Sequence, residues 1–80
     1  GAPFVPAEDV ESKLARLAPG LSRDVLSAGL KAFQRVRSEG RSSSPVLAVI
    51  DYSKPSTQKR LWVFDVVAGA LLLHELVTHG

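Results

Sequence analysis

The sequence predicts a small α+β domain in which two N-terminal helices precede a three-stranded antiparallel β-meander. In the first half of the chain, apolar residues recur at helical spacing over about residues 6–18 and 22–39. From Val46 onward the chain holds most of its β-branched and aromatic residues, and polar residues interrupt them where strand ends and turns are needed. We therefore expect residues 1–40 to form a helical segment, and residues 46–80 to form a segment of strands and a hairpin.

The first helix is expected to begin at Pro6, because the missing N–H of proline costs nothing in the first helical turn. Three acidic residues follow close to the positive end of the helix dipole, where negative charge is favourable. The Pro19-Gly20 pair should end this helix. Its apolar stripe is narrow and consists of Val10, Leu14 and Leu17.

The second helix has stronger signals. Ser22 is placed to cap it by accepting a hydrogen bond from the first turn, and Gly40 should end it with a positive φ. Gly29 lies on its apolar face and costs roughly 1 kcal/mol relative to alanine. Gly29 either lets another element approach closely or is merely tolerated, and the sequence leaves both interpretations open. The rest of that face consists of Val25, Leu26, Leu30, Phe33 and Val36.

Strands are predicted over Val46–Tyr52, Leu61–Val67 and Leu71–Thr78, with Ala68-Gly69 as the turn between the last two. The first strand is apolar on both faces until Asp51, so we expect it to be central in the sheet. The hairpin should place Val63 or Asp65 near Leu73–Glu75, with a register that depends on the turn.

The hairpin is more apolar than one solvated face would require. Thirteen of the seventeen residues from Leu61 to Val77 are apolar, whereas a half-exposed antiparallel sheet alternates more cleanly. A chain of 80 residues is short and buries only roughly 60% of its unfolded surface. We therefore expect outside cover for the hairpin, from the remainder of a larger domain or from a second copy of the chain.

Composition excludes several classes of function. The chain has no cysteine, so thiol catalysis and disulfides are impossible within it. It has no methionine, so we expect either that Gly1 results from processing or cutting of a longer protein or that Gly1-Ala2 is left from cloning. The net charge of +2 comes from interspersed acids and bases, without the basic stripe that a nucleic-acid partner requires. Asp65, His74 and Glu75 interrupt the apolar run, so no transmembrane segment is expected.

Few residues in this chain could carry chemistry. His74 and His79 are five apart on a predicted strand and so face opposite sides, which argues against a shared metal. There is no G-x-S-x-G nucleophile elbow and no glycine-rich phosphate loop. The acids in the strands, Asp51, Asp65 and Glu75, are expected to be structural. We therefore assign no catalytic, cofactor-binding or metal-binding residue and expect no cofactor.

Two stretches nevertheless resemble a known family. Leu47–Asp65 has the sequence LAVIDYSKPSTQKRLWVFD, and Leu73–Gly80 has the sequence LHELVTHG. They resemble the opening of the murein L,D-transpeptidase catalytic-domain family, the YkuD-like group, whose strand–loop–strand has the form I-D-Y-S-x-P-S-x-x-K-R-L-W-V-x-D. The helix Val25–Val36 resembles the helix that precedes this segment in the family. The resemblance covers about residues 21–80.

The resemblance implies a larger, mostly-β YkuD-like fold, of which this chain would be the amino-terminal portion. It also implies export to the bacterial periplasm or cell envelope and a peptidoglycan peptide stem as substrate. In the family a cysteine forms an acyl-enzyme and a histidine acts as base. This chain departs from the pattern because it lacks the segments that carry both residues. His79-Gly80 corresponds to an earlier His-Gly of the family, so no catalytic role is transferred to it.

What the resemblance transfers is a scaffold. The loop Ser53–Arg60 is expected to be a structural clasp or part of a groove rim. The clasp is favoured because the polar side chains of the loop can bond to its own backbone. The scaffold residues are Asp51, Tyr52, Ser53, Pro55, Ser56, Lys59, Arg60 and Trp62.

Three functional hypotheses follow. The first is an amino-terminal part of a cell-envelope L,D-transpeptidase-like protein that is inactive alone. The alternative is a self-contained, non-catalytic interaction module that binds peptide or cell wall at an open strand edge. A winged-helix nucleic-acid binder is the third, and the few bases on the outer face of the second helix argue against it.

Overall fold

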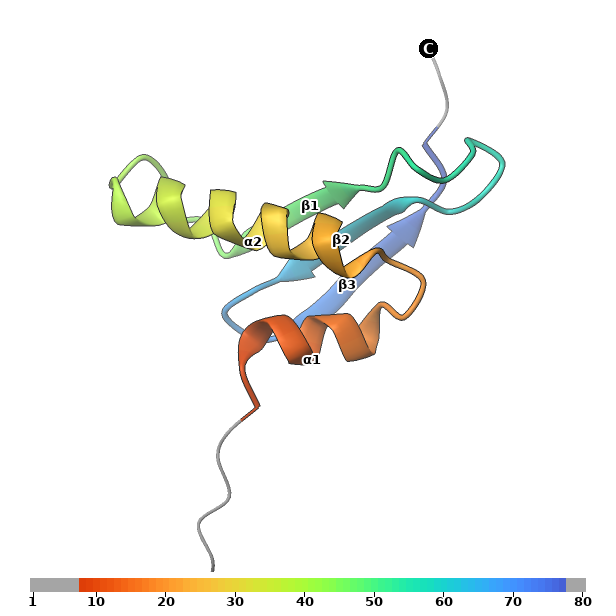
Figure 1. Cartoon of the computed structure of the whole chain (residues 1–80). Helices are drawn as coiled ribbons and strands as arrows, with labels where there is room; N and C mark the ends of the chain where they lie inside the picture. The colour runs from red at the N-terminus through yellow and green to blue at the C-terminus, as the bar shows by residue number, and fades with distance from the viewer. Residues whose placement is uncertain (1–7, 78–80) are drawn as a thin grey trace, which may run out of the picture.

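The computed structural model describes residues 8–77 and contains two helices followed by three strands (Figure 1). The strands form one antiparallel sheet in the order β1-β2-β3. The predicted α+β arrangement, two helices and then a β-meander, is therefore confirmed. The elements are α1 (Val10–Leu17), α2 (Arg23–Ser38), β1 (Val46–Ile50), β2 (Leu61–Asp65) and β3 (Ala70–Glu75).

Helix α1 begins later than the sequence predicted. Asp9 is its N-cap, with an extended backbone, and its carboxylate accepts a hydrogen bond from the Ser12 N–H at 2.8 Å. This bond satisfies one of the free donors of the first turn and fixes the start of the helix at Val10. Pro6, the predicted start, lies outside the described residues. Of the predicted stripe, Leu14 is completely buried.

Helix α2 matches its predicted range to within one residue at each end, but its capping differs. Ser22 occupies the N-cap position, yet its side chain makes no capping hydrogen bond, so that prediction was wrong. The Ser22 N–H instead donates to the carboxylate of Asp51 at 3.3 Å. At the other end Gly40 has a φ of 69°, as predicted for the residue after a helix.

The position of β1 in the sheet corrects a second prediction. β1 pairs only with β2 within the described residues and is therefore an edge strand, while β2 is central. The apolar residues of β1 suggested burial on both faces, but only the face under α2 is covered. Val49 on that face is 6% exposed, whereas Val46 on the opposite face is 46% exposed.

The hairpin register confirms the first of the two alternatives that the sequence left open. Val63 pairs with Leu73 as expected, but Asp65 pairs with Ala70 instead of the region Leu73–Glu75. Two features cause the difference. β2 already ends at Asp65, whose carboxylate accepts from the Ala68 N–H at 2.8 Å and so begins the turn. A β-bulge then leaves one extra residue, Leu72, in β3 between the pairs of Val63 and Phe64.

Both helices lie on the same face of the sheet, with α2 over β1 and α1 over β3 (Figure 1). Trp62 and Phe64 on β2 point to that face and are 1% and 0% exposed. This face of the hairpin therefore needs no outside cover, contrary to expectation. The remaining buried apolar residues are Leu14, Ala18, Leu21, Leu26, Leu30, Val49 and Val66.

The opposite face of the sheet carries no helix among the described residues. Leu61 and Val63 of β2 point to it, because side chains alternate along a strand, and they are half-buried. Leu73 of β3 lies opposite Val63 and is 42% exposed, and Leu72 at the bulge is 56% exposed. This face therefore exposes apolar side chains within residues 8–77, and its cover from outside the chain stays a prediction. No helix within residues 8–77 combines the length and the apolar character needed to cross a membrane.

Gly29 is the point where α2 approaches the sheet. A Cβ added there would lie 3.2 Å from Cγ2 of Val49 and 3.8 Å from a methyl carbon of Leu47. Since 3.2 Å is closer than ordinary van der Waals contact, the absence of a side chain sets the distance between α2 and β1. The close-approach interpretation of Gly29 is therefore the one that the structure supports.

We expect Gly29→Leu to lower the free energy of unfolding by about 1–3 kcal/mol, because the leucine would force α2 away from β1. Ala28→Leu is the matched control. Ala28 is the neighbouring residue and is exposed, so this change should stay within about 0.5 kcal/mol. Urea unfolding followed by Trp62 fluorescence measures both. Equal effects of the two substitutions would contradict the close packing at Gly29.

Candidate functional site

The resemblance to a known family centres on the segment that connects β1 to β2. This loop, residues 51–60, projects beyond the end of the sheet and lies close to where the chain leaves β3 (Figure 1). Its first and last residues are paired, because the Asp51 N–H donates to the Arg60 carbonyl at 2.9 Å. Asp51 and Arg60 are also its most buried residues, at 1% and 4% exposed. The site is therefore built around two charged side chains that are almost completely covered.

Asp51 joins the loop to the start of α2. Its Oδ1 accepts from the N–H and the hydroxyl of Ser53, at 3.1 and 2.5 Å. Its Oδ2 accepts from the Ser22 N–H at 3.3 Å, next to the positive end of the α2 dipole. One carboxylate thus holds the β1–β2 loop and the α1–α2 connection together.

These contacts determine the ionisation of Asp51. The pKa of its carboxyl lies below the ordinary value of 3.8, first because the Ser53 hydroxyl donates to the ionised form. Burial acts in the opposite direction, and the backbone N–H groups of Ser22 and Ser53 and the charge of Lys54 lower the pKa further. The donors outweigh burial, so Asp51 is an ionised structural acceptor and does not have the raised pKa of a general acid.

Arg60 holds the other end of the loop. Its Nη1 donates to the Lys54 carbonyl at 3.2 Å, and its Nη2 donates to the Val77 carbonyl at 3.4 Å, beyond the end of β3. The guanidinium carbon lies 5.2 Å from the centroid of the Tyr52 ring. The buried Nε makes no hydrogen bond within the described residues. Arg60 therefore ties the loop to the segment that follows β3, with the Tyr52 ring over its charge.

The loop also bonds to its own backbone. The Lys54 N–H donates to the Asp51 carbonyl at 3.1 Å, and the Gln58 N–H donates to the Pro55 carbonyl at 3.0 Å. Together with the Ser53 and Arg60 contacts, these bonds support the clasp interpretation over that of a groove rim. Of the other scaffold residues, Ser56 is half-buried in the loop and Lys59 is exposed.

His74 lies under the loop and packs against the core. Its ring stacks on Trp62 with centroids 4.4 Å apart and an angle of 16° between the planes. Its Nε2 lies 2.9 Å from the Lys59 carbonyl, and because a carbonyl only accepts, Nε2 carries the proton of that bond. Trp62 and His74 are cross-strand partners. Sequence analysis missed the pair because it depends on the turn length and the bulge.

Among residues 8–77 the loop brings no nucleophile and base together. The Ser53 hydroxyl donates to Asp51, and within residues 8–77 it makes no hydrogen bond to a histidine that could accept its proton. No three residues of the metal-ligating types gather anywhere within residues 8–77. His79, the other histidine of the sequence, lies outside the described residues. The contacts of Asp51 and Arg60 thus position the loop and the segment that follows β3.

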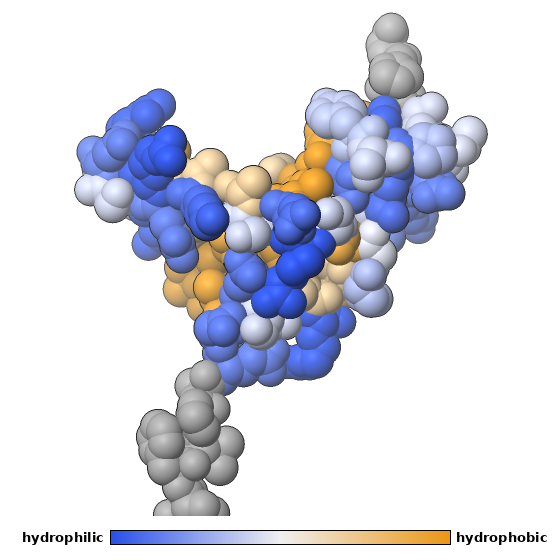
Figure 2. Space-filling model, in the orientation of Figure 1, coloured by the Kyte–Doolittle hydropathy of each residue, from blue (hydrophilic) through white to orange (hydrophobic). Residues whose placement is uncertain are grey.

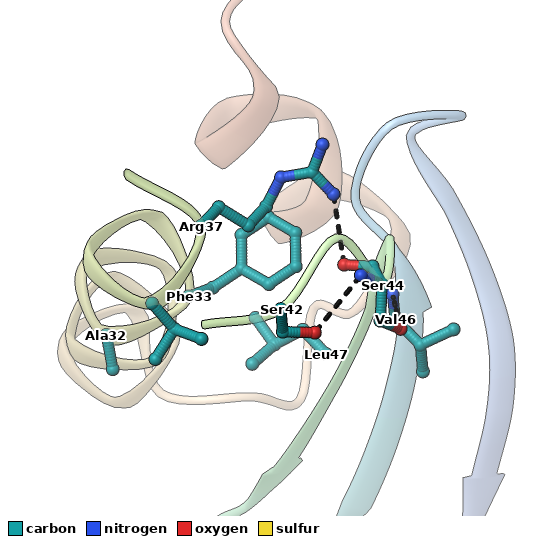
Figure 3. A pocket seen from close by; sticks show the side chains of 8 residues that line it. Ala32, Phe33, Arg37, Ser42, Ser44, Val46 and Leu47 are labelled. Carbon is teal, nitrogen blue, oxygen red and sulfur yellow. Dashed lines mark hydrogen bonds between the residues drawn. The ribbon is translucent and has the colours of Figure 1, made fainter. Parts of the chain in front are cut away.

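A groove lies apart from this loop, between the C-terminal half of α2 and the start of β1 (Figure 3). Its volume is about 260 Å³, and its walls are mostly apolar. The Arg37 side chain crosses one end, where its Nη1 donates to the Ser43 and Ser44 carbonyls at 3.1 and 3.0 Å. The lining residues are Ala32, Phe33, Val36, Arg37, Ser42, Ser44, Val46 and Leu47.

Comparison with known proteins identifies a family. The family model described as the L,D-transpeptidase catalytic domain matches residues 17–80 of the chain. The chain belongs to the L,D-transpeptidase catalytic-domain family. No curated protein and no solved structure matched the chain.

The family match fits the geometry of the site. It takes in all of α2, the three strands and the loop 51–60, and it leaves out nearly all of α1. It begins four residues before the start of the resemblance found in the sequence. In this L,D-transpeptidase-family chain the matched region therefore coincides with the part held together by Asp51, Arg60 and the Trp62–His74 stack.

We expect Asp51→Asn to lower the free energy of unfolding at neutral pH by about 1–3 kcal/mol, because an amide leaves one buried N–H donor without an acceptor. The pH dependence should change as well. Since the folded pKa of Asp51 lies below 3.8, its stabilising effect is complete above that pH and is lost as the pH falls through the folded pKa. Asp51→Asn should therefore flatten the decline in stability below pH 3.8.

The matched control is Asp24→Asn, which removes an exposed carboxylate from the first turn of α2. The free energy of unfolding of Asp51→Asn should still decline somewhat at acid pH, because the Ser12 N–H lowers the pKa of Asp9 too. Urea unfolding at a series of pH values measures all three proteins. If the free energy of unfolding falls equally steeply at acid pH in Asp51→Asn and in the wild type, Asp51 does not tie the site together.

Proposed function

We propose that this chain is the amino-terminal part of a cell-envelope L,D-transpeptidase-like protein that acts on peptidoglycan peptide stems by cysteine acyl transfer. The observation that carries the proposal is the family match, which extends over residues 17–80. The eighty residues contain no cysteine. The chain alone is therefore an inactive scaffold, and the nucleophile comes from residues outside it.

The uncovered face of the sheet supports this proposal. Exposed leucines gather there and at the end of β3: Leu72, Leu73 and Leu76 are 56%, 42% and 51% exposed. Monomeric soluble proteins rarely leave large contiguous apolar patches in contact with water. We infer that the remainder of the catalytic domain covers this face, or a second copy of the chain where that remainder is absent.

The site described above has a role in this proposal. Arg60 fixes the segment after β3 to the β1–β2 loop through the Val77 carbonyl. Asp51 fixes the same loop to the start of α2. The scaffold thereby sets the direction in which the chain leaves the sheet, and a catalytic histidine and cysteine carried further on would be positioned from there. Export to the periplasm or cell envelope is part of the proposal, because the substrate is found there.

A self-contained interaction module is the second candidate function, and one observation favours it. Trp62 and Phe64 are 1% and 0% exposed within the chain itself, so the chain has a core of its own. Such a module would bind peptide or cell wall without catalysis.

The first test is an activity assay of the full product of the parent gene. We expect that product to contain a cysteine, and to exchange the terminal residue of a muropeptide tetrapeptide stem for a free D-amino acid, measured by mass spectrometry. Cysteine-to-alanine replacement should abolish the exchange, and the eighty-residue chain should show none. A gene that stops directly after Gly80, or a longer product without cysteine, would overturn the proposal.

The second test separates the two candidates. If part of the domain is missing, the isolated chain should self-associate in sedimentation or bind an apolar dye through the open sheet face. Leu73→Lys should reduce either effect without unfolding the protein, because Leu73 is 42% exposed. Lys59→Leu, which alters an exposed residue of the loop, is the control for a general change in hydrophobicity. A well-folded monomer that binds no dye would favour the self-contained module.

A further inference from the structure

We propose that the outer edge of β1 binds an extended peptide segment of a partner protein, apolar at alternate residues and acidic near Arg37. The inference depends only on β1, α2 and the groove between them. It rests on the second candidate function, the self-contained module, and a strand from the remainder of a larger domain paired with β1 in the full gene product would overturn it.

The hydrogen-bond pattern shows which backbone groups of β1 are free to bind. The Asp51 N–H donates to the Arg60 carbonyl, and the Val66 N–H donates to the Pro45 carbonyl, at 2.9 and 2.8 Å. Because bonded and non-bonded pairs alternate along an antiparallel ladder, Val46, Ala48 and Ile50 must point their N–H and C=O groups away from β2. The Ser44 hydroxyl accepts from the Val46 N–H at 3.2 Å. The groups of Ala48 and Ile50 face outward with no strand beside them in residues 8–77.

The edge of β1 also lacks the protection that edge strands usually have. Natural sheets blunt their edges with bulges, charged side chains or proline within the strand. β3, the opposite edge, has the bulge at Leu72 and the charge of Glu75. Between Val46 and Ile50 β1 has none of these devices, and its sequence VLAVI is entirely apolar. Of the two edges, β1 is therefore the one suited to accept another strand.

The groove supplies a place for side chains of the added strand. A notch with an apolar floor opens between the C-terminal end of α2 and the loop 51–60 (Figure 2). In close-up, Phe33 of α2 and Leu47 of β1 form walls of the groove at one end of this edge (Figure 3). A strand placed about 4.8 Å from β1 would turn every second side chain towards α2. Its side chains should be apolar there, because the groove is about 260 Å³ in volume and mostly apolar.

The positive charge at the C-terminal end of α2 indicates that the bound segment carries an acidic residue at one end. From Lys31 to Ser38, α2 has three bases and no acid. Arg37 lies at the groove, with its guanidinium carbon 5.4 Å from the centroid of the Phe33 ring. It bonds only to backbone carbonyls, and none of the ion pairs formed within residues 8–77 includes it. An acidic side chain on the docked segment would give this arginine its counter-charge.

A second copy of the chain fits this edge poorly. α2 packs over β1, and the close contact of Gly29 with Val49 holds it there. Pairing of two β1 strands would bring them to about 4.8 Å, and the two α2 helices would follow. Packed helices need about 8–10 Å between their axes. The site therefore suits a single extended segment without a helix above it.

The test uses synthetic probe peptides and the eighty-residue chain at low salt. The probes are capped hexapeptides of alternating valine and threonine, with aspartate at the first or the last position, and matched peptides with lysine there. Two-dimensional amide NMR should show shifts at Ala48, Ile50 and the groove residues. The better aspartate peptide should bind about two- to fivefold tighter than its lysine counterpart, the range for one exposed ion pair.

Two matched substitutions locate the site. Ala48→Pro removes an N–H that points away from β2, so it should abolish binding and keep the sheet, whereas Ala48→Thr keeps the N–H and should keep binding. Arg37→Gln should remove the preference for aspartate. Arg41→Gln should leave it unchanged, because Arg41 pairs with Glu39 and does not line the groove.

A third control needs no folded variant. N-methylation of alternate residues of the probe peptide blocks strand pairing from the peptide side, and one of the two alternate patterns should abolish binding. Shifts confined to the β3 edge, or binding that both methylation patterns leave intact, would overturn the proposal. So would a dimer in sedimentation that Ala48→Pro dissociates, because the occupant would then be a second copy.

Discussion

Two short helices can cover only one face of a three-stranded sheet, and most properties of this structure depend on that constraint. The covered face holds Trp62 and Phe64 on the central strand, where α1 and α2 exclude water from both. At roughly 25 cal/mol per Å² of apolar surface, two large aromatic side chains supply much of the stabilisation available to so short a chain. The opposite face, with Leu73 exposed, contributes far less.

The second contribution to the fold comes from buried polar groups at the end of the sheet. Asp51 accepts three hydrogen bonds, which join a loop between strands to a connection between helices. Burial of a carboxylate is costly unless donors satisfy it, and here the donors lower its pKa in spite of burial. Arg60 is held by two carbonyls and the Tyr52 ring. The family-like loop is thus a structural junction between the strands and the helices.

The sequence predicted the order and type of every element, because periodicity and glycine or proline punctuation are local signals. It also identified Asp51 and Arg60 as scaffold residues through the family resemblance. It failed where the outcome depended on contacts distant in sequence. Ser22 was predicted to cap α2 with its side chain, but Asp51 accepts the Ser22 N–H instead. The prediction that β1 is central in the sheet was also wrong, because the apolar residues of β1 do not reveal which of its faces is covered. The Trp62–His74 pair depends on a bulge that no local pattern indicated.

The Trp62–His74 stack gives the folded chain an optical reporter of its own. Trp62 is the only tryptophan in the chain, so its indole accounts for nearly all the emission excited at long ultraviolet wavelengths. The imidazole ring lies against the indole in the folded state alone, with centroids 4.4 Å apart. Loss of the β2–β3 pairing would separate the two rings and expose the indole to water, so the emission of Trp62 reports the integrity of that pairing without an added label.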